Sequence, residues 1–271
     1  MKISPLPQGF GAIVSDIDVA GEVSTTTIAE LQSAYDNHHL LIFRDLGELS
    51  GAQQAEIAGW FGAIGANRTA DGKPWTVLDN VDEVGSAVLP FHCDISYMEH
   101  PFDGLSLHPL ALPEGGSPTT FISNAEGWDN LDAELQTLLK HRKVRHAFHD
   151  YAMVPGDWPE LAWWHPASLP HAATNRPMLF VSQNHVREIE GFDEAESASL
   201  LQRIFAVQYA AERQYEHHWR KGDLLIWNNV AIQHARTQAA KLGAGRRIMQ
   251  RVALGKHGFM EQVERLRVAA S

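Results

Sequence analysis

The sequence has a single cysteine, Cys93, among its 271 residues. One cysteine excludes an internal disulfide framework. A chain of this length buries about 70–75% of its unfolded surface, so it needs neither a disulfide nor a structural metal to fold. No apolar run approaches the roughly 20 residues that cross a bilayer. Residues 1–16 have one lysine and no continuous apolar core, unlike a signal peptide. We therefore expect a cytoplasmic protein with no membrane partner.

Basic residues are also scarce relative to acidic ones. The chain has 22 lysines and arginines against 33 aspartates and glutamates, which gives a formal net charge of −11 at pH 7. Binding to nucleic acid requires clustered basic side chains, and the chain has only short basic runs, such as residues 140–143. We therefore expect no nucleic-acid partner. Because the sequence has no repeat, low-complexity tract or linker, we expect a single domain over residues 1–271.

Short apolar stretches, bounded by glycine, proline and polar residues, predict a mostly β protein. Strands are expected at residues 10–18, 40–46, 89–94, 104–112, 119–123, 144–149, 178–182, 224–228, 233–236 and 246–253. Helices are expected at residues 25–37, 50–62, 124–140 and 193–211. Residues 66–85 and 150–173 are expected to be loops, the second of them an active-site lid. Many short strands with few helices indicate an antiparallel sandwich or barrel with flanking helices.

The 15 histidines motivate a search for a metal site. His92 and Asp94 form a His-x-Asp pattern at the end of a predicted strand, where alternate side chains point to the same face. One imidazole and one carboxylate are two of the three ligands of the 2-His-1-carboxylate triad of non-haem Fe(II) oxygenases. His234, on a later short strand, is the best candidate for the third ligand. A hydrogen-bonded surface pair fits the His-x-Asp spacing as well.

Arg247 and Arg251 follow His234 along the chain, on another predicted strand. Their separation of four residues places both side chains on one face of that strand. Guanidinium groups inside a sheet-rich core are costly unless each meets an anion, and arginine binds carboxylates through two parallel hydrogen bonds. The pair therefore indicates two anionic small molecules, or one with two charged ends. A solvated strand face with salt bridges remains the alternative.

Other aromatic and histidine residues have two interpretations each. Three tryptophans lie in or near the predicted lid, namely Trp158, Trp163 and Trp164. They either line a hydrophobic substrate pocket or simply pack the lid against the protein. For His165 and His171, hydrogen bonds within the loop are favoured over contact with a substrate. His217 and His218 are adjacent, so on a strand they face opposite sides, and we expect them at the surface.

The segments HCD, GGSPTTF, GDLLIWNNVAIQH and RRIMQR occur in this order along the chain. Together with the N-terminal segments GFGAIVSDID, LLIFRDL and WFGAIG, they resemble the taurine dioxygenase family of Fe(II)- and 2-oxoglutarate-dependent oxygenases. The resemblance covers nearly the whole chain and is weakest over residues 66–88 and 150–173. It implies a double-stranded β-helix, that is, a jelly-roll or cupin-like core with flanking helices. It also implies O2 as co-substrate and a homo-oligomer, either a dimer or a tetramer.

The resemblance assigns roles by position. It implies that Fe(II) is bound by His92, Asp94 and His234. It implies that the distal carboxylate of 2-oxoglutarate is held by Thr119 and Arg247, and that Arg251 grips an anionic group of the main substrate. Trp227 matches an aromatic residue often found near the site, although core packing explains it as well. Because related halogenases have a small residue where this chain has Asp94, the carboxylate favours oxygenation.

Departures from the family pattern bear on the substrate. This chain has Asn228-Asn229 where the family often has Asp-Asn, and Val230 where it often has arginine, which we interpret as changes around the site. Taurine-using members place a histidine and an asparagine before the His-x-Asp motif to hold the sulfonate, whereas residues 46–91 contain no histidine. This argues against taurine and leaves an anionic substrate expected through Arg251.

Three functions remain open from the sequence. The first is hydroxylation of a small anionic substrate, a carboxylate or sulfonate, with conversion of 2-oxoglutarate and O2 to succinate and CO2. The second keeps the same cofactor chemistry but gives desaturation or ring formation on an amino-acid-like natural-product intermediate. The third is a non-catalytic jelly-roll binding protein. The complete triad and both arginines argue against the third.

Overall fold

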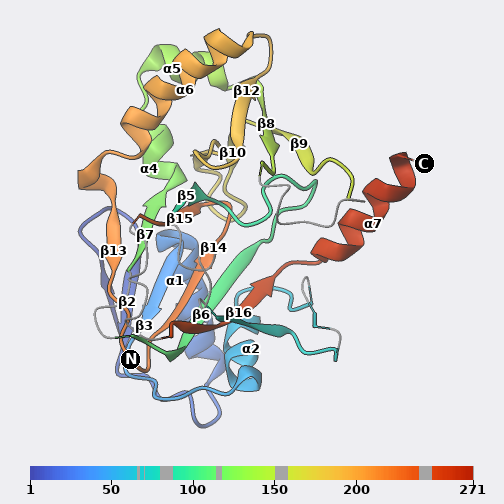
Figure 1. Ribbon diagram of the computed structural model, residues 1–271. Coiled ribbons are helices and arrows are strands. Elements are labelled where there is room, and N and C mark those ends of the chain that lie inside the picture. The colour runs from blue at the N-terminus through green and yellow to red at the C-terminus, as the bar shows by residue number, and fades with distance from the viewer. Residues whose placement is uncertain are drawn as a thin grey trace.

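Two facing β-sheets form the core of the protein in the computed structural model, which describes residues 1–65, 68–69, 71–79, 88–113, 118–149, 158–237 and 246–270. The larger sheet has the order β1-β2-β3-β14-β6-β16-β4 (Figure 1) and is antiparallel except for the β2–β3 pair. Its strands are β1 (Lys2–Pro5), β2 (Ala12–Ser15), β3 (Leu40–Phe43), β14 (Leu224–Asn228), β6 (Gly104–Ala111), β16 (Ile248–Leu254) and β4 (Trp75–Asp79).

The smaller sheet has the order β13-β7-β15-β5. Its strands are β13 (Tyr215–His217), β7 (Thr119–Ser123), β15 (Ile232–Arg236) and β5 (Leu89–His92). Buried side chains from both sheets, among them Leu105, Phe121, Trp227, Ile232 and Met249, form one apolar cluster. The predicted mostly β, jelly-roll core with flanking helices is therefore confirmed, and strands β7 and β14 have the predicted bounds.

Two helices near the N-terminus cover the larger sheet. Helix α1 (Thr25–His38) begins after Ser24, whose hydroxyl accepts a hydrogen bond from the Thr27 amide, and it contributes Leu31 and Tyr35 to a buried cluster with β2, β3 and β14. Helix α2 (Gly51–Gly59) begins with a capping box made by Ser50 and Gln53. Side-chain caps of this kind satisfy amide groups that have no partner within the helix, so local sequence sets both helix starts.

A second layer lies at the end of the molecule away from the N-terminus (Figure 1). It holds a three-stranded sheet with the order β12-β8-β9 and a hairpin of β10 with β11. Its elements are β8 (Lys143–Ala147), β9 (Ala162–Pro166), β10 (Ser168–Pro170), β11 (Pro177–Leu179), β12 (Val186–Ile189), α4 (Asn124–Asp129), α5 (Ala133–Leu139), α6 (Glu194–Gln208) and a short 3-10 helix at Ala211–Arg213. The prediction of one helix over residues 124–140 was wrong, because Asp132 caps a new helix by accepting a hydrogen bond from the Leu135 amide.

Both predicted loops contain regular structure. Strand β4 lies within residues 66–85 and pairs with β16. Strands β9 and β10 lie within residues 150–173, where β9 pairs with β8. The loop predictions were therefore wrong over these strands, and residues 66–67, 70, 80–87 and 150–157 lie outside the described residues. The alternation of polar and apolar residues that marks a strand is hard to recognise in the β9 sequence AWWHP, because large aromatic side chains occupy both faces of this strand.

Helix α7 (Phe259–Ala270) follows β16 and projects from the side of the molecule (Figure 1). The sequence analysis predicted no helix there. Phe259 and Val263 attach the helix to a cluster with Tyr97 and Leu161, which brings Phe259 close to the smaller sheet. Within the described ranges, none of the helices combines the length and the apolar character needed to cross a membrane.

Candidate metal and substrate site

Pairing of two strands in the smaller sheet brings His92 and His234 together. His92 is the last residue of β5, and His234 on β15 is its direct cross-strand partner. The strand ends at His92, so the prediction that Asp94 shares a strand face with it was wrong in detail. Asp94 instead lies in the turn that follows, where Ile95 has a left-handed φ of 49°. That backbone conformation is costly for a β-branched residue, and strained residues of this kind cluster at functional sites.

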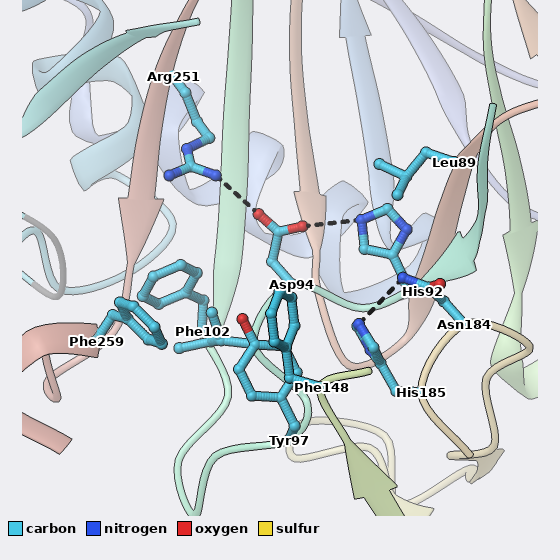
Figure 2. Close-up of a pocket in the computed structure, with 11 residues that line it drawn as sticks. Leu89, His92, Asp94, Tyr97, Phe102, Phe148, Asn184, His185, Arg251 and Phe259 are labelled. Atoms are coloured by element: carbon cyan, nitrogen blue, oxygen red, sulfur yellow. Dashed lines mark hydrogen bonds and ion pairs between the residues drawn. The ribbon is translucent and has the colours of Figure 1, made fainter. Parts of the chain in front are cut away.

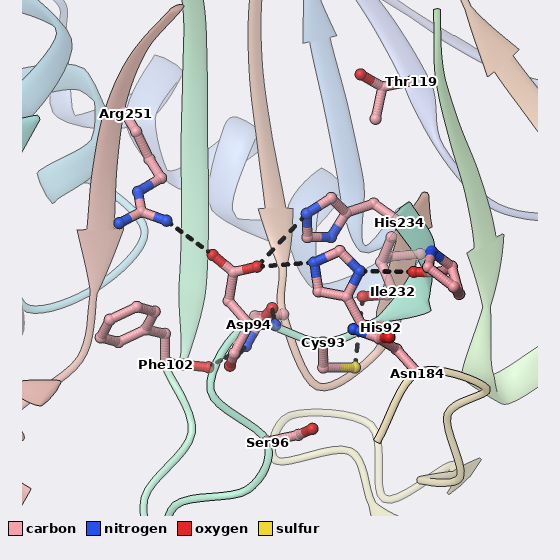
Figure 3. A network of polar contacts seen from close by, with 12 residues as sticks. His92, Cys93, Asp94, Ser96, Phe102, Thr119, Asn184, Ile232, His234 and Arg251 are labelled. Atoms are coloured by element: carbon pink, nitrogen blue, oxygen red, sulfur yellow. Dashed lines mark hydrogen bonds and ion pairs between the residues drawn. The ribbon is translucent and has the colours of Figure 1, made fainter. Parts of the chain in front are cut away.

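The three side chains converge on one point (Figure 3). Asp94 Oδ1 lies 3.3 Å from His92 Nε2 and 3.5 Å from His234 Nε2. One ligand atom of each residue lies within 4.8 Å of the others, so the group could hold a metal ion. Two imidazoles and one carboxylate form the donor set of a facial triad, which leaves coordination positions open for other ligands.

Protonation states in the cluster suit a metal. His92 Nδ1 donates a hydrogen bond to the Pro90 carbonyl oxygen at 2.8 Å, which leaves the Nε2 lone pair directed at the cluster. Burial, and then the neighbouring His92, lowers the pKa of His234 to about 3, so its imidazole is neutral. Burial raises the pKa of Asp94, but the neighbouring His92, His234 and Arg251 outweigh burial and hold that pKa below its ordinary value. A neutral imidazole and an ionised carboxylate are the forms that bind metals.

Asn229 fixes the position of Asp94. Its Oδ1 accepts a hydrogen bond from the Asp94 amide at 2.9 Å, and its Nδ2 donates to the carbonyl oxygens of Asp94 and Phe102, each at 3.0 Å. Asn229 is fully buried in the turn between β14 and β15. It therefore ties the Asp94 turn to the turn that leads into the His234 strand. Its neighbour Asn228 instead caps that second turn by accepting from the amides of Val230 and Ala231.

A cavity of about 320 Å³ opens beside the cluster (Figure 2). Its described lining includes His92 and Asp94 from the triad, Arg251, and four aromatic residues that gather below Asp94 in the view, namely Tyr97, Phe102, Phe148 and Phe259. Asn184 and His185 complete another wall. The sequence analysis missed these two residues because they come from the loop between β11 and β12, which no motif connects to the triad.

Arg251 and Arg247 make different contacts around the site. Arg251 Nη1 forms an ion pair with Asp94 Oδ2 at 3.1 Å, while its Nε is buried without a hydrogen-bond partner among the described residues. Arg247 Nη2 donates to Thr119 Oγ1 at 3.3 Å. Burial, and then the charge of Arg236, lowers the pKa of Arg247 to about 10. Trp219, which the sequence analysis did not single out, donates from Nε1 to the same Thr119 oxygen at 3.0 Å.

The other candidate residues have structural contacts. Trp227 is fully buried in the core, and its ring meets His234 edge-on at 5.1 Å, so both interpretations of this residue hold. His165 Nε2 bonds to the Met98 carbonyl oxygen, and His171 bonds to Thr174. His217 is fully buried against Asp223, so its predicted surface position was wrong, whereas His218 is exposed. The cavity is lined by none of the tryptophans at positions 158, 163 and 164 within the described chain.

Comparisons with known proteins agree with this site. The family model described as "Taurine catabolism dioxygenase TauD, TfdA family" matches residues 2–253. The (S)-phenoxypropionate/alpha-ketoglutarate-dioxygenase of Sphingobium herbicidovorans is 27% identical over 257 residues, which cover 87% of this chain and 88% of the relative. Pentalenolactone F synthase of Streptomyces avermitilis is 23% identical over 271 residues, which cover 87% and 89%.

A solved structure of a taurine dioxygenase from Burkholderia xenovorans has the same fold, with a TM-score of 0.80 at 21% identity over 93% of this chain and 88% of that one. The family match extends over both sheets and includes the three side chains of the cluster. The resemblance drawn from the sequence is thereby confirmed. The chain belongs to the TauD/TfdA family and is an α-ketoglutarate-dependent dioxygenase, an enzyme that uses Fe(II), 2-oxoglutarate and O2.

Proposed function

We propose that this enzyme hydroxylates a small anionic organic substrate, a carboxylate or a sulfonate. In this proposal Fe(II) is held by His92, Asp94 and His234, 2-oxoglutarate by Arg247 and Thr119, and the substrate anion by Arg251. When bound, Fe(II) and 2-oxoglutarate supply the oxidising chemistry, in which one oxygen atom of O2 enters succinate, CO2 is released and the other oxygen atom enters the substrate. The protein supplies binding, orientation and exclusion of water.

Thr119 and Arg247 are arranged to receive a carboxylate. The Thr119 oxygen already accepts two hydrogen bonds, from Arg247 Nη2 and Trp219 Nε1. A hydroxyl has one proton and two lone pairs, so both lone pairs are occupied and its proton is left to be donated. Arg247 has a buried Nε without a hydrogen-bond partner in the described part of the chain. A carboxylate at this place would accept from both groups and offset the cost of burying the guanidinium.

Arg251 supports the anionic character of the substrate. One of its nitrogens holds Asp94 Oδ2, which leaves Oδ1 facing the two histidines. Arg251 also lines the cavity. An anion bound there would sit beside the metal position with its apolar part against the aromatic side chains. Because an oxidant of this kind attacks the nearest C–H bond, such anchoring decides which carbon reacts.

One observation carries the proposal, namely the convergence of the His92, Asp94 and His234 side chains beside a cavity that also contains a guanidinium. The test measures succinate release from 2-oxoglutarate, with and without added Fe(II), over a panel of aryloxy acids, sulfonates and amino acids. We expect Fe(II)-dependent release that is stimulated by at least one anionic compound, lost in His92→Ala and retained in the exposed control His218→Ala.

Product mass then separates the outcomes of the reaction. Hydroxylation adds one oxygen atom to the substrate, whereas desaturation or ring closure removes two hydrogen atoms. If the wild-type enzyme binds Fe(II) and keeps its fold but releases no succinate with any compound, the proposal fails and a binding function is favoured.

A further inference from the structure

A half-buried tyrosine contacts the residues that precede both histidines of the cluster. Tyr209, at the C-terminal end of α6, stacks flat on Phe91, with ring centroids 4.7 Å apart. Its hydroxyl donates to Gln233 Oε1 at 2.8 Å. Phe91 precedes His92, and Gln233 precedes His234. Because successive side chains on a strand face opposite sides, the tyrosine lies behind the sheet face that carries the two histidines.

The same hydroxyl contacts a third segment, the loop that forms one wall of the cavity. The Gln183 amide donates to Tyr209 Oη at 2.9 Å, and the next residue, Asn184, lines the cavity. A tyrosine hydroxyl has a single proton, so it accepts from Gln183 and donates that proton to Gln233. One side chain thereby joins both strands of the histidine pair to the cavity wall.

The other contacts of Gln233 fix its amide group in one orientation. Its Nε2 donates to the Val181 carbonyl oxygen at 2.9 Å and to Asn124 Oδ1 at 2.7 Å. A carbonyl oxygen only accepts, so the amide nitrogen must face Val181, and Oε1 remains to accept from Tyr209. Asn124 in turn donates from Nδ2 to the Val230 carbonyl oxygen at 2.6 Å. Gln233 and Asn124 are fully buried, so water has no direct access to replace these bonds.

The ring of His234 lacks a support that the ring of His92 has. The second ring nitrogen of His92 is held by the Pro90 carbonyl oxygen, whereas His234 Nδ1 is buried without a hydrogen-bond partner among the described residues. Groups that bond the second nitrogen of a histidine ligand normally set its orientation. The position of His234 therefore depends on strand β15, on neighbouring aromatic rings and on the bonds that hold the adjacent Gln233.

We propose that Tyr209 is a positioning residue for the metal site. Its hydroxyl acts on His234 through Gln233. Its ring supports His92 through Phe91. This inference rests on the proposed function, which assigns the two histidines to the metal. Without the hydroxyl, the strand that carries His234 loses one of its attachments, so a metal ion should bind more weakly and with a changed ligand geometry.

Tyr209→Phe tests the hydroxyl alone, because the ring and its stacking on Phe91 remain. Co(II) is the probe, since its visible absorption reports the geometry of its ligands and its titration gives the affinity without any substrate. We expect Tyr209→Phe to lower Co(II) affinity about tenfold, as for other groups that orient metal ligands, and to shift the absorption bands at saturating Co(II).

Tyr215→Phe is the matched control. It also removes the hydroxyl of a half-buried tyrosine, which here bonds to the side chain of His217. We expect this variant to keep the Co(II) affinity and the absorption spectrum of the wild type. Equal changes in the two variants would overturn the inference, because a general loss of stability would then account for them.

The inference and the proposed function can fail separately. Co(II) binding that His92→Ala leaves unchanged would refute the proposed metal site. Co(II) binding that His92→Ala abolishes, but that has the same affinity and spectrum in Tyr209→Phe as in the wild type, would refute the role of Tyr209 while the metal site stands.

Discussion

Asn229→Ala tests whether a residue outside the triad controls how firmly the triad binds a metal ion. The substitution removes hydrogen bonds to the Asp94 amide, the Asp94 carbonyl and the Phe102 carbonyl, all of them inside the protein. Asn229 is fully buried, so water has no direct access to replace the lost amide group. The turn that carries Asp94 would lose its attachment to the turn that leads to His234.

The expected loss in the free energy of unfolding follows from the number of hydrogen bonds removed. A typical hydrogen bond contributes about 1 kcal/mol net, so three of them give a loss of about 3 kcal/mol in the free energy of unfolding. Buried backbone groups left without partners increase this loss. Partners that orient metal ligands are worth about 10–100-fold in metal affinity. Asn229→Ala should therefore lower stability and also weaken metal binding.

Urea denaturation and a competitive Zn(II) titration measure the two effects. Asn228→Ala is the matched control, because Asn228 holds two backbone amides in the same turn and lies near His171 but does not touch Asp94. We expect the control to lose stability by about 2 kcal/mol and to keep its metal affinity. Equal metal affinities in the two variants, or a stability change below about 0.5 kcal/mol in Asn229→Ala, would refute the reasoning.

Three further outcomes are expected. Trp219→Phe keeps an aromatic ring near Arg247 but removes the donor to Thr119, so KM for 2-oxoglutarate should rise about fivefold; an unchanged KM would place Trp219 outside the site. Zn(II) at 100 times its dissociation constant should stabilise the wild type by about 2.7 kcal/mol, and thermal unfolding of His234→Ala should show no such gain. Burial raises the pKa of Asp223, but the hydrogen bonds from His217 and Arg44 outweigh burial and lower that pKa. The ionised Asp223 therefore stabilises the fold above pH ~4, and this stabilisation is lost as the pH falls below that value. Asp223→Asn should lower the free energy of unfolding at pH 7 and make stability, measured by denaturation at a series of pH values, fall less steeply in acid.

Local patterns predicted the parts of the site that lie on regular strands. His92 and His234 could be identified because short apolar stretches in the sequence mark β5 and β15. These strands pair in the smaller sheet, where the two histidines are cross-strand partners. Asp94 was predicted correctly as a member of the cluster for a reason that proved incomplete. It reaches the cluster through a strained turn and the hydrogen bonds of Asn229, and neither feature has a signature in residue spacing.

Long-range packing explains what the sequence analysis missed or placed wrongly. His217 was expected at the surface because adjacent residues on a strand face opposite sides, but β13 turns it inward onto Asp223, which also pairs with Arg44. His185 becomes part of the cavity only because the second layer of structure packs against β5. Its orientation depends on Ser96 and His146, which are distant from it in sequence. Such a hydrogen-bonded chain is visible only when the three segments are placed together.

The charges of the site agree with the anionic substrate class of the proposed function. With Fe(II) bound, the ion, Asp94, Arg247 and Arg251 carry a net formal charge of three, all positive. 2-Oxoglutarate contributes two negative charges, so one further negative charge, from a substrate in the cavity of about 320 Å³ that Arg251 lines, would balance these four groups. A zwitterionic amino acid would leave one positive charge without compensation, at a cost that a partly buried site makes large. The charge balance and the guanidinium of Arg251 therefore favour the same kind of molecule, a monoanionic acid without an ammonium group.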